Sequence, residues 1–488
     1  MKAAMRTGTD QPAKGDRGTM MTGEQYLDSL RDGRRVALDG VLLPDVTADP
    51  GLGNAARWVA TGYDRIRSGY PDGVNPIYQI PRTVEDLRAR LDLVQESDVT
   101  VALTSAVLAL LTAAPRLAMA NPAYRERILH YFEDCRRRDV RFAEVITDAK
   151  GDRSLPPGKQ DDPDLYLRVV DRDADGIVIN GAKFHITMGP LVHELVVMPT
   201  KRMKPGEEQY AVACAVPVNS PGVTQIATSP HPRGSDGRSH PVSGRHTDPD
   251  SIVIFDHVHV PYERVFLDGE VEESAVVAHS LGLWERINGV ADMARLGDLL
   301  VGMAQLVAEA NGVDRIPHIK DKIAEMVIYA TLVRAGLEAS IAGATHTEDG
   351  MIAPNELYAN AAKYHAAAHY PVMVRNLHDI AGGAVATAPS MADYDNPQLR
   401  PYIDKYLRTM PGVDGYYRMR LFHLIRDVTA DALGGRELVS WLQSGGGLFA
   451  QRTVTRKHYD IEAAKDLARR AGGLLDGAEP ASYPDGHG

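Results

Sequence analysis

Residues 166–187 have the sequence YLRVVDRDADGIVINGAKFHIT, and this stretch decides the fold class. Tyr166–Val170 and Ile177–Ile179 are strand-like runs, and the pair Asp175-Gly176 lies between them. An Asp-Gly pair between two such runs is typical of a β-hairpin, because both residues tolerate the backbone angles of a tight turn. We therefore predict a hairpin here, and it places a β-rich segment in the middle of the chain.

Three more runs have the pattern of short strands: Glu194–Met198, Tyr210–Val216 and Ile252–Phe255. Together with the hairpin they predict a compact antiparallel β-domain over residues 146–273. A loop over residues 229–250, rich in Pro, Gly, Ser and His, interrupts this domain. Loops of that length in compact domains are usually functional or disordered, so we interpret this one as a lid.

Both flanks of the β-domain have the 3.6-residue period of helices. In residues 21–145, Thr22 and Gln25 have capping-box spacing, the helical pattern extends over Val84–Phe142, and the largely apolar Val99–Ala114 predicts a buried helix. In residues 274–471 we predict long helices over Val276–Ala310, Ile316–Ala342, Pro354–Asp379 and Tyr416–Leu433. Residues 1–20 and 472–488 have no such period and are predicted to be a disordered leader and a loose tail.

The composition excludes several classes of protein. The chain has 488 residues, of which 44% are hydrophobic and 24% charged, which is ordinary for a globular protein. A net charge of −11 without a sustained basic run excludes nucleic acid as the main partner. The chain lacks an uninterrupted apolar span of membrane length and a secretory signal, so we expect a cytoplasmic protein. Its two cysteines, Cys135 and Cys214, are too few for a disulfide framework or a cysteine-ligated metal site.

Other motifs do not indicate a metal or a dinucleotide. The loop histidines His231, His240 and His246 follow no ligand spacing, and His365 and His369 lack the glutamate of a zinc-protease motif, so we assign no metal. Gly51-Leu-Gly53 lacks a third glycine and a surrounding βαβ unit, which argues against direct binding of NAD(P)H.

Several ordered blocks of sequence resemble the family of 4-hydroxyphenylacetate 3-hydroxylase and 4-hydroxybutyryl-CoA dehydratase. The resemblance extends from Met21 to about Lys465. It is carried by Thr147-Asp-Ala-Lys-Gly-Asp-Arg153, Asp162-Pro-Asp-Leu-Tyr-Leu-Arg168, Asp175–Lys183 followed by Thr187, Val253–Pro261, Asp321–Met326, Asp379-Ile-Ala-Gly-Gly383 with Pro389-Ser390, and Gly434-Gly-Arg436.

The resemblance implies an acyl-CoA-dehydrogenase-like α+β fold with an N-terminal helical domain, a middle antiparallel β-domain and a C-terminal helical bundle. It also implies FAD and a homotetramer. One branch of the family takes reduced FAD from a separate NAD(P)H-flavin reductase and uses O2 to hydroxylate phenols through a hydroperoxyflavin. The other branch binds FAD and a four-iron cluster and dehydrates a CoA thioester.

This chain lacks residues that each branch of the family uses at its active site. The cluster ligands of the dehydratases align with Thr104 and Leu108 and with positions near Glu285 and Asp292, which supply no thiolate, so we predict no iron–sulfur cluster. The substrate-binding arginine, tyrosine and histidine of the hydroxylases align with Thr104, Leu108 and Glu144. We expect Thr104 and Leu108 to lie in the substrate site and Glu144 to act there as a base.

The flavin contacts of the family carry over to a larger set of positions. They are Val145, Ile146, Lys150, Gly151, Asp152, Arg153, Thr187 and the turn Ser444, Gly445, Gly446 and Gly447. Hydroxyl and basic groups with a glycine-rich turn suit a flavin ring, which needs hydrogen-bond donors and close approach of backbone. His185 and His193 flank Thr187 and are the other catalytic candidates.

These residues predict a two-component monooxygenase that uses reduced FAD to oxygenate a small aromatic substrate. One alternative is a cluster-free FAD enzyme that dehydrates, isomerises or dehydrogenates an acyl-CoA thioester. A second alternative is a flavin-binding relative that has lost its chemistry. The resemblance leaves the substrate, the position oxidised and the reductase open.

Overall fold

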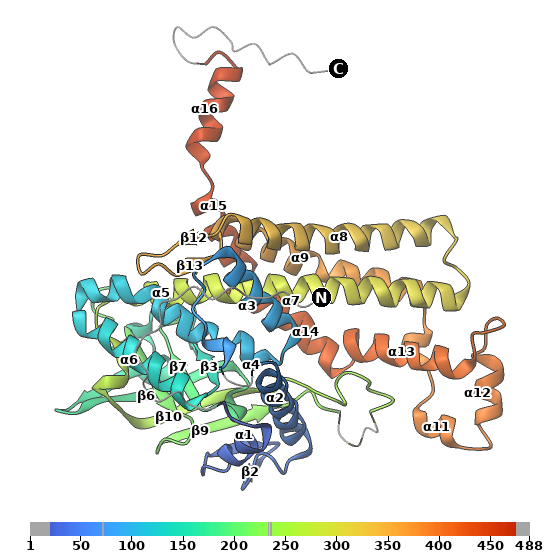
Figure 1. The fold of residues 1–488 in the computed structure, drawn as a ribbon, viewed down its shortest axis with the longest axis horizontal. Coiled ribbons are helices and arrows are strands. Elements are labelled where there is room, and N and C mark those ends of the chain that lie inside the picture. The colour runs from blue at the N-terminus through green and yellow to red at the C-terminus, as the bar shows by residue number, and fades with distance from the viewer. Residues whose placement is uncertain (1–19, 71–72, 233, 235–236, 475–488) are drawn as a thin grey trace.

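The structure, a computed structural model, describes residues 20–70, 73–232, 234 and 237–474. The predicted leader and tail therefore lie almost entirely outside the described residues. The described chain has helices at both ends and strands in the middle (Figure 1). The predicted order along the chain, helices followed by a β-domain and then by helices, is confirmed.

The N-terminal helices cover the β-domain on one side. The capping box of Thr22 and Gln25 is present at the start of α1, as predicted. The helices of this part are α1 (Gly23–Ser29), α2 (Pro50–Gly69), α3 (Val84–Glu96), α4 (Val99–Ala102), α5 (Ser105–Ala120) and α6 (Pro122–Arg138). In the described residues, the stretch Val99–Ala120 is long and apolar enough to cross a membrane, but 72% of its most apolar window is buried inside the protein. Because α5 packs between α6 and α7, it is the buried core helix that the sequence predicts.

The middle domain contains two sheets that pack on a common core. One has seven strands in the order β2-β1-β9-β10-β6-β4 with β5 paired to β6, and the other has the order β11-β8-β7-β3. Their bounds are β1 (Val36–Leu38), β2 (Val41–Leu43), β3 (Phe142–Val145), β4 (Thr147–Asp148), β5 (Arg168–Arg172), β6 (Gly176–Thr187), β7 (Glu194–Val197), β8 (Val212–Pro217), β9 (Val223–Thr228), β10 (Asp250–Pro261) and β11 (Val265–Asp268). The β5–β6 hairpin is confirmed, and its turn is closed by Asp173, whose carboxylate accepts hydrogen bonds from the backbone amides of Asp175 and Gly176.

The sheets differ from the sequence prediction in two respects. They are not purely antiparallel, because β1 pairs in parallel with β9 and β3 in parallel with β7. In addition, β1, β2 and β3 come from residues before 146, and β4, β9 and β11 were not predicted. Strands of three or four residues such as β1 and β3 have too short a pattern to be distinguished from loop or helix by period alone.

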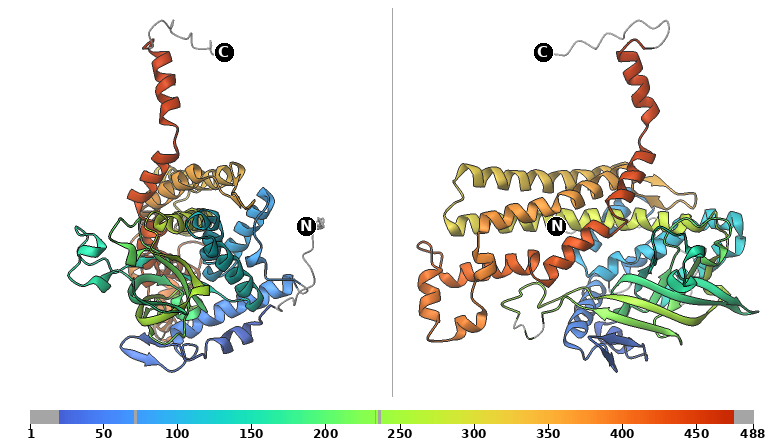
Figure 2. Two further views of the ribbon diagram at one scale, coloured as in Figure 1. Left: turned by 90° about the vertical axis from the view of Figure 1, so that its left-hand side faces the viewer. Right: turned by 180° about the vertical axis from the view of Figure 1, so that it is seen from behind.

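The C-terminal part is a bundle built on α7 (Ser274–Asn311), α8 (Pro317–Ala342) and α9 (Glu356–Ala381), which run side by side (Figure 1). The predicted helix Tyr416–Leu433 is divided into α13 (Gly415–Thr429) and α14 (Ala432–Gln443). The remaining elements are β12 (Thr345–His346), β13 (Ile352–Ala353), α10 (Ala384–Thr387), α11 (Met391–Asp395), α12 (Arg400–Tyr406), α15 (Leu448–His458) and α16 (Ile461–Ala471). Helix α16 projects away from the body of the protein in every view (Figures 1 and 2), and none of its residues is buried.

Candidate functional site

The candidate site lies where β3, α5 and α7 meet. Glu144 is the third residue of β3, and its Oε1 lies 2.6 Å from the Oγ of Ser105, the first residue of α5. Ser105 also contacts Asn288 of α7, whose Nδ2 lies 3.4 Å from the serine Oγ. Three elements that are far apart in sequence therefore bring polar side chains to one point inside the protein.

Glu144 is held in surroundings that favour its neutral form. Burial raises its pKa well above the usual value, the nearby charge of Glu285 raises it further, and the Ser105 hydrogen bond opposes these effects. The Ser105 hydroxyl is also within 2.5 Å of the carbonyl oxygen of Ala102. Because one hydroxyl has one proton, a neutral Glu144 can donate to Ser105 while Ser105 donates to Ala102.

Helix α7 presents a polar stripe to the same region. Glu285, Asn288 and Asp292 are spaced i, i+3 and i+7, which places them on one face of a helix. Glu285 accepts a hydrogen bond from the Gly445 amide at 2.9 Å, and burial raises its pKa. Burial raises the pKa of Asp292 to about 7. The glutamate and aspartate noted in the sequence at iron-ligand positions are thus partly buried carboxyl groups with raised pKa values.

The positive charges of the site lie beside Glu285. Lys363 of α9 is buried, and its Nζ donates to the carbonyl oxygen of Trp441 at 2.8 Å. Burial lowers the pKa of Lys363 to about 8, although Glu285 opposes this shift. Arg286 donates from Nε to the Gly445 carbonyl at 2.8 Å. A single lysine within a helix has no local pattern, so sequence reasoning missed Lys363.

A second polar cluster positions Thr187, a predicted flavin contact at the end of β6. The Thr187 hydroxyl donates to Asp250 Oδ1 at 2.7 Å, and Arg436 holds both oxygens of the same carboxylate at 2.8 and 3.2 Å. Arg436 also contacts Glu437 Oε1 at 3.0 Å. The motif Gly434-Gly-Arg436 therefore contains a structural support for Thr187, a role that the sequence did not indicate.

Several cations lie close to Lys150 in the predicted flavin segment after β4. Burial lowers the pKa of Lys150, and the nearby charges of Arg153, Lys183 and Lys201 lower it further. Asp148 opposes them, but it already forms an ion pair with Lys183 at 2.8 Å. Such a group of cations suits the phosphates of a dinucleotide.

The glycine turn after α14 also fits a bound cofactor. Gly445 and Gly446 have φ angles of 69° and 81°, and a Cβ on Gly445 would lie 2.9 Å from Arg286 Cγ. The turn therefore needs glycine and exposes backbone groups, as predicted for close approach of a ligand. Gly151, Asp152 and Arg153 are exposed, so a ligand can reach them. These features fit FAD.

The fold restricts how Val145 and Ile146, two of the predicted flavin contacts, can reach a cofactor. Val145 has no exposed surface, and its carbonyl oxygen accepts from the Met198 amide at 3.0 Å. The carbonyl oxygen of Ile146 accepts from Lys183 Nζ at 2.9 Å. A flavin contact in this segment therefore needs Ile146, which is partly exposed, because the Val145 side chain packs in the core of the β-domain.

Thr104 and Leu108 do not present a surface to a substrate. The Thr104 hydroxyl donates to the Val101 carbonyl and accepts from Arg90, which leaves it buried and fully bonded. Leu108 is 2% exposed and packs in the helical core. Both side chains are buried in this structure, where Ser105 faces Glu144, and their contact with a substrate stays a prediction.

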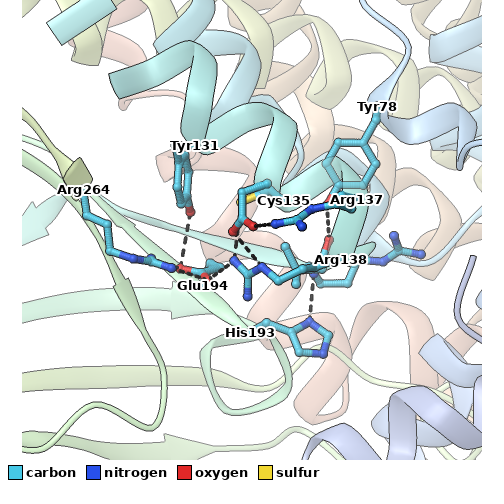
Figure 3. Close-up of polar contacts among 11 residues, drawn as sticks. Tyr78, Tyr131, Cys135, Arg137, Arg138, His193, Glu194 and Arg264 are labelled. Carbon is cyan, nitrogen blue, oxygen red and sulfur yellow. Dashed lines mark hydrogen bonds and ion pairs between the residues drawn. The ribbon is translucent and has the colours of Figure 1, made fainter. Parts of the chain in front are cut away.

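His193 lies beside the ion pairs of Glu194 with Arg138 and Arg264 (Figure 3). Its Nδ1 accepts from the Arg141 amide at 2.9 Å, and its Nε2 lies 2.8 Å from Ser29 Oγ. Burial lowers the pKa of His193 well below its usual value. Because both ring nitrogens have protein partners, the ring has no free nitrogen for a substrate proton. This geometry argues against the predicted catalytic role.

His185 is exposed, has a φ of 62°, and lies beside the Phe184 ring. Its catalytic role stays a prediction.

The loop over residues 229–250 is anchored at its described part. Asp427 of α13 accepts from the backbone amides of Val242 and Ser243 and from the Ser243 hydroxyl, and His246 stacks on Trp58 at 4.5 Å. Its role as a lid stays a prediction.

Among the residues that the structure describes, no group of three His, Cys, Asp or Glu side chains is arranged to hold a metal ion. Both cysteines are buried, and burial raises the pKa of Cys214 to about 12.

Comparison with known proteins gives matches along almost the whole chain. The family model described as 4-hydroxyphenylacetate 3-hydroxylase N terminal matches residues 22–267, and the corresponding C-terminal model matches residues 275–473. The chain is 29% identical to the oxygenase component of 4-hydroxyphenylacetate 3-monooxygenase from Geobacillus sp., over 85% of this chain and 89% of that protein. It is 28% identical to 4-hydroxybutyryl-CoA dehydratase/vinylacetyl-CoA-Δ-isomerase from Clostridium aminobutyricum, over 93% of this chain and all of that protein.

Solved structures of an oxygenase component and of a dehydratase both superpose on this fold. The oxygenase component of 4-hydroxyphenylacetate 3-monooxygenase complexed with FAD has a TM-score of 0.84 at 26% identity, and the match covers 92% of this chain and 98% of that one. An oxygen-tolerant 4-hydroxybutyryl-CoA dehydratase from N. maritimus has a TM-score of 0.86 at 27% identity, covering 96% and 98%.

Proposed function

Because the chain belongs to the 4-hydroxyphenylacetate 3-hydroxylase family, we propose that it is the oxygenase component of a two-component monooxygenase, which oxygenates a small aromatic substrate. The observation that carries this proposal is the match of both halves of the chain to the family whose named members include such oxygenase components. The cations around Lys150 and the glycine turn at Gly445 support FAD as the cofactor. When bound, reduced FAD supplies the electrons that activate O2.

The residues of this chain have distinct roles in the proposal. Glu144 takes a proton from the substrate at its carboxylate, and its burial-raised pKa brings it closer to the working pH, where a general base is most effective. Arg436 and Asp250 hold the Thr187 hydroxyl toward the cofactor. Lys150 and Arg153 bind the phosphates, and the loop anchored by Asp427 excludes water from the site.

The proposal includes partners. A separate NAD(P)H-flavin reductase delivers reduced FAD, since the chain has no dinucleotide fingerprint of its own. We also propose a homotetramer in the cytoplasm. Its support is the exposed apolar surface of the C-terminal part, with Ile328 at 59% and Leu467 at 65%. An isolated helix as short as α16 is marginal in water, so contact with another subunit would stabilise it.

A second candidate function is cluster-free acyl-CoA chemistry. The observation that favours it is the superposition on a 4-hydroxybutyryl-CoA dehydratase over 96% of this chain. Such an enzyme would use FAD without O2 and without a reductase.

One experiment tests the proposal against this candidate. Reduced FAD is titrated anaerobically into the full-length protein and then mixed rapidly with O2, while flavin absorbance and peroxide release are recorded with and without aromatic substrates. The oxygenase proposal expects saturable binding and substrate-dependent O2 use that yields hydroxylated product. Conversion of an acyl-CoA thioester under anaerobic conditions, without product formation in O2, would establish the alternative instead.

A further inference from the structure

The cluster around Glu144 contains a buried hydrogen-bond acceptor, Asn288 Oδ1, that the described part of the protein leaves without a donor. Asn288 is 4% exposed and donates from Nδ2 to the Ala102 carbonyl at 3.1 Å. A carbonyl oxygen only accepts, so this contact fixes which end of the amide faces Ala102. Within the described residues, the Asn288 Oδ1 has no hydrogen-bond partner. A buried orphan acceptor of this kind costs free energy unless a ligand or water donates to it.

The charges around this orphan acceptor are also unbalanced. Glu144 interacts with the negative Glu285 and with the neutral Ser105. Lys363 and Arg286 interact with Glu285, and each of them donates to a backbone carbonyl oxygen. Glu285 thus has two cations, whereas an ionised Glu144 has none among its nearest charged groups.

We propose that the substrate carries a protonated primary amine that binds between Glu144 and Glu285 and donates its third hydrogen to Asn288 Oδ1. This inference rests on the proposed function, because it places the amine in the site of the oxygenase. An ammonium group has three donors and no acceptor, which suits a site of two carboxyl groups and the unpartnered Asn288 Oδ1. A carboxylate or phenolate at this point would face Glu144 and Glu285 with the wrong charge and could not donate to Asn288 Oδ1.

The proposal has a thermodynamic consequence for protons. Burial and the charge of Glu285 favour the neutral form of Glu144, whereas a bound ammonium favours its ionised form. Binding is therefore expected to release protons, up to about one per amine bound. A residue with a merely structural role would not produce this release.

The test uses three probes that share one ring and chain length: 2-phenylethylamine, 2-phenylethanol and phenylacetate. Each is titrated calorimetrically into the full-length protein loaded with FAD, in two buffers that differ in ionisation enthalpy. We expect the amine to bind at least about tenfold more tightly than the other two, the factor that one charge-assisted hydrogen bond supplies. We also expect proton release with the amine alone.

Variants identify the groups responsible. Glu144→Gln keeps the shape of the side chain but is expected to abolish proton release and to reduce the amine preference about tenfold. Asn288→Leu should reduce the preference without abolishing proton release. Glu338→Gln, at an exposed pair with Arg88 on α8, is the matched control and should change neither.

The outcomes separate this inference from the proposed function. Normal FAD binding and O2 use, with equal affinity for the three probes or preference for phenylacetate, would overturn the amine inference alone. Failure of the protein to bind FAD in a separate fluorescence titration would overturn the proposed function and this inference with it. Selective amine binding that the Glu144→Gln variant retains would also overturn the assignment.

Discussion

Replacement of Arg436 by Met tests the cluster that supports Thr187. Arg436 forms two contacts with Asp250, at 2.8 and 3.2 Å, and one with Glu437 at 3.0 Å. The side chains of Arg436, Asp250 and Glu437 are 15%, 27% and 19% exposed, so the ion pairs are largely shielded from water. Asp248 contributes a further, partly buried carboxyl group, and its pKa is raised by burial and lowered by Arg436. The substitution removes the cation and leaves three carboxyl groups.

Breaking a buried ion pair by removing one partner costs about 3–5 kcal/mol, and we expect a loss of that size in the free energy of unfolding. The control is Arg88→Met. Arg88 also holds a carboxylate with two nitrogens, but it and its partner Glu338 are 45% and 50% exposed. An exposed pair contributes at most about 1 kcal/mol, so the same substitution should cost little there.

The loss of unfolding free energy in the Arg436→Met variant should also depend on pH. Burial raises the pKa of Glu437 and of Asp248, and Arg436 opposes both shifts. Without Arg436 these pKa values rise further, so the folded state binds protons that the unfolded state releases. A group with a raised carboxyl pKa destabilises the fold as pH rises above the unfolded pKa. The deficit of the Arg436→Met variant should therefore be larger at about pH 8 than at about pH 5.

Urea unfolding followed by fluorescence and circular dichroism measures both effects, and a titration of FAD measures the support of Thr187. We expect weaker FAD binding in the Arg436→Met variant and unchanged binding in the Arg88→Met variant. Equal losses of stability in the two variants, or a deficit that does not change with pH, would refute the reasoning.

Three other perturbations test separate parts of the structure. Glu285→Gln removes the charge that raises the pKa of Glu144, so the pH at which amine affinity levels off should fall; an unchanged pH profile would contradict the coupling. Glu194→Ala leaves Arg138 and Arg264 without a buried partner and should cost about 3–5 kcal/mol in urea unfolding, and a loss below about 1 kcal/mol would contradict that role. Gly445→Ala forces a side chain into a φ of 69° and should cost about 1–2 kcal/mol and weaken FAD binding, with Gly435→Ala, whose added Cβ meets open space, as the control.

The long helices were predictable because their patterns are long. Helix α5 is apolar on nearly every face, and a helix of that kind must be buried. The β5–β6 hairpin was predictable from its turn residues. The short strands β1 and β3 were not, because each is defined by pairing with a partner far away in sequence rather than by its own residues.

The site was predictable only in part. Resemblance to a family indicated Glu144, and the structure places it beside Ser105 and near Glu285. The spacing of Glu285, Asn288 and Asp292 on one face of a helix was visible in the sequence, but a polar stripe is more often exposed to solvent than buried. Their role depends on the strand that covers them, which is a property of the tertiary fold.

The parallel pairing of β1 with β9 has a consequence for the order of folding. Val36 pairs with Gln225, so the larger sheet cannot be completed until the ribosome has released a long part of the chain. Until then β1 and β2 can pair only with each other, as a short two-stranded ribbon that is marginally stable in water. Contacts of such large sequence separation slow folding, and the unpaired edge of β1 offers a pairing surface to other nascent chains during that interval.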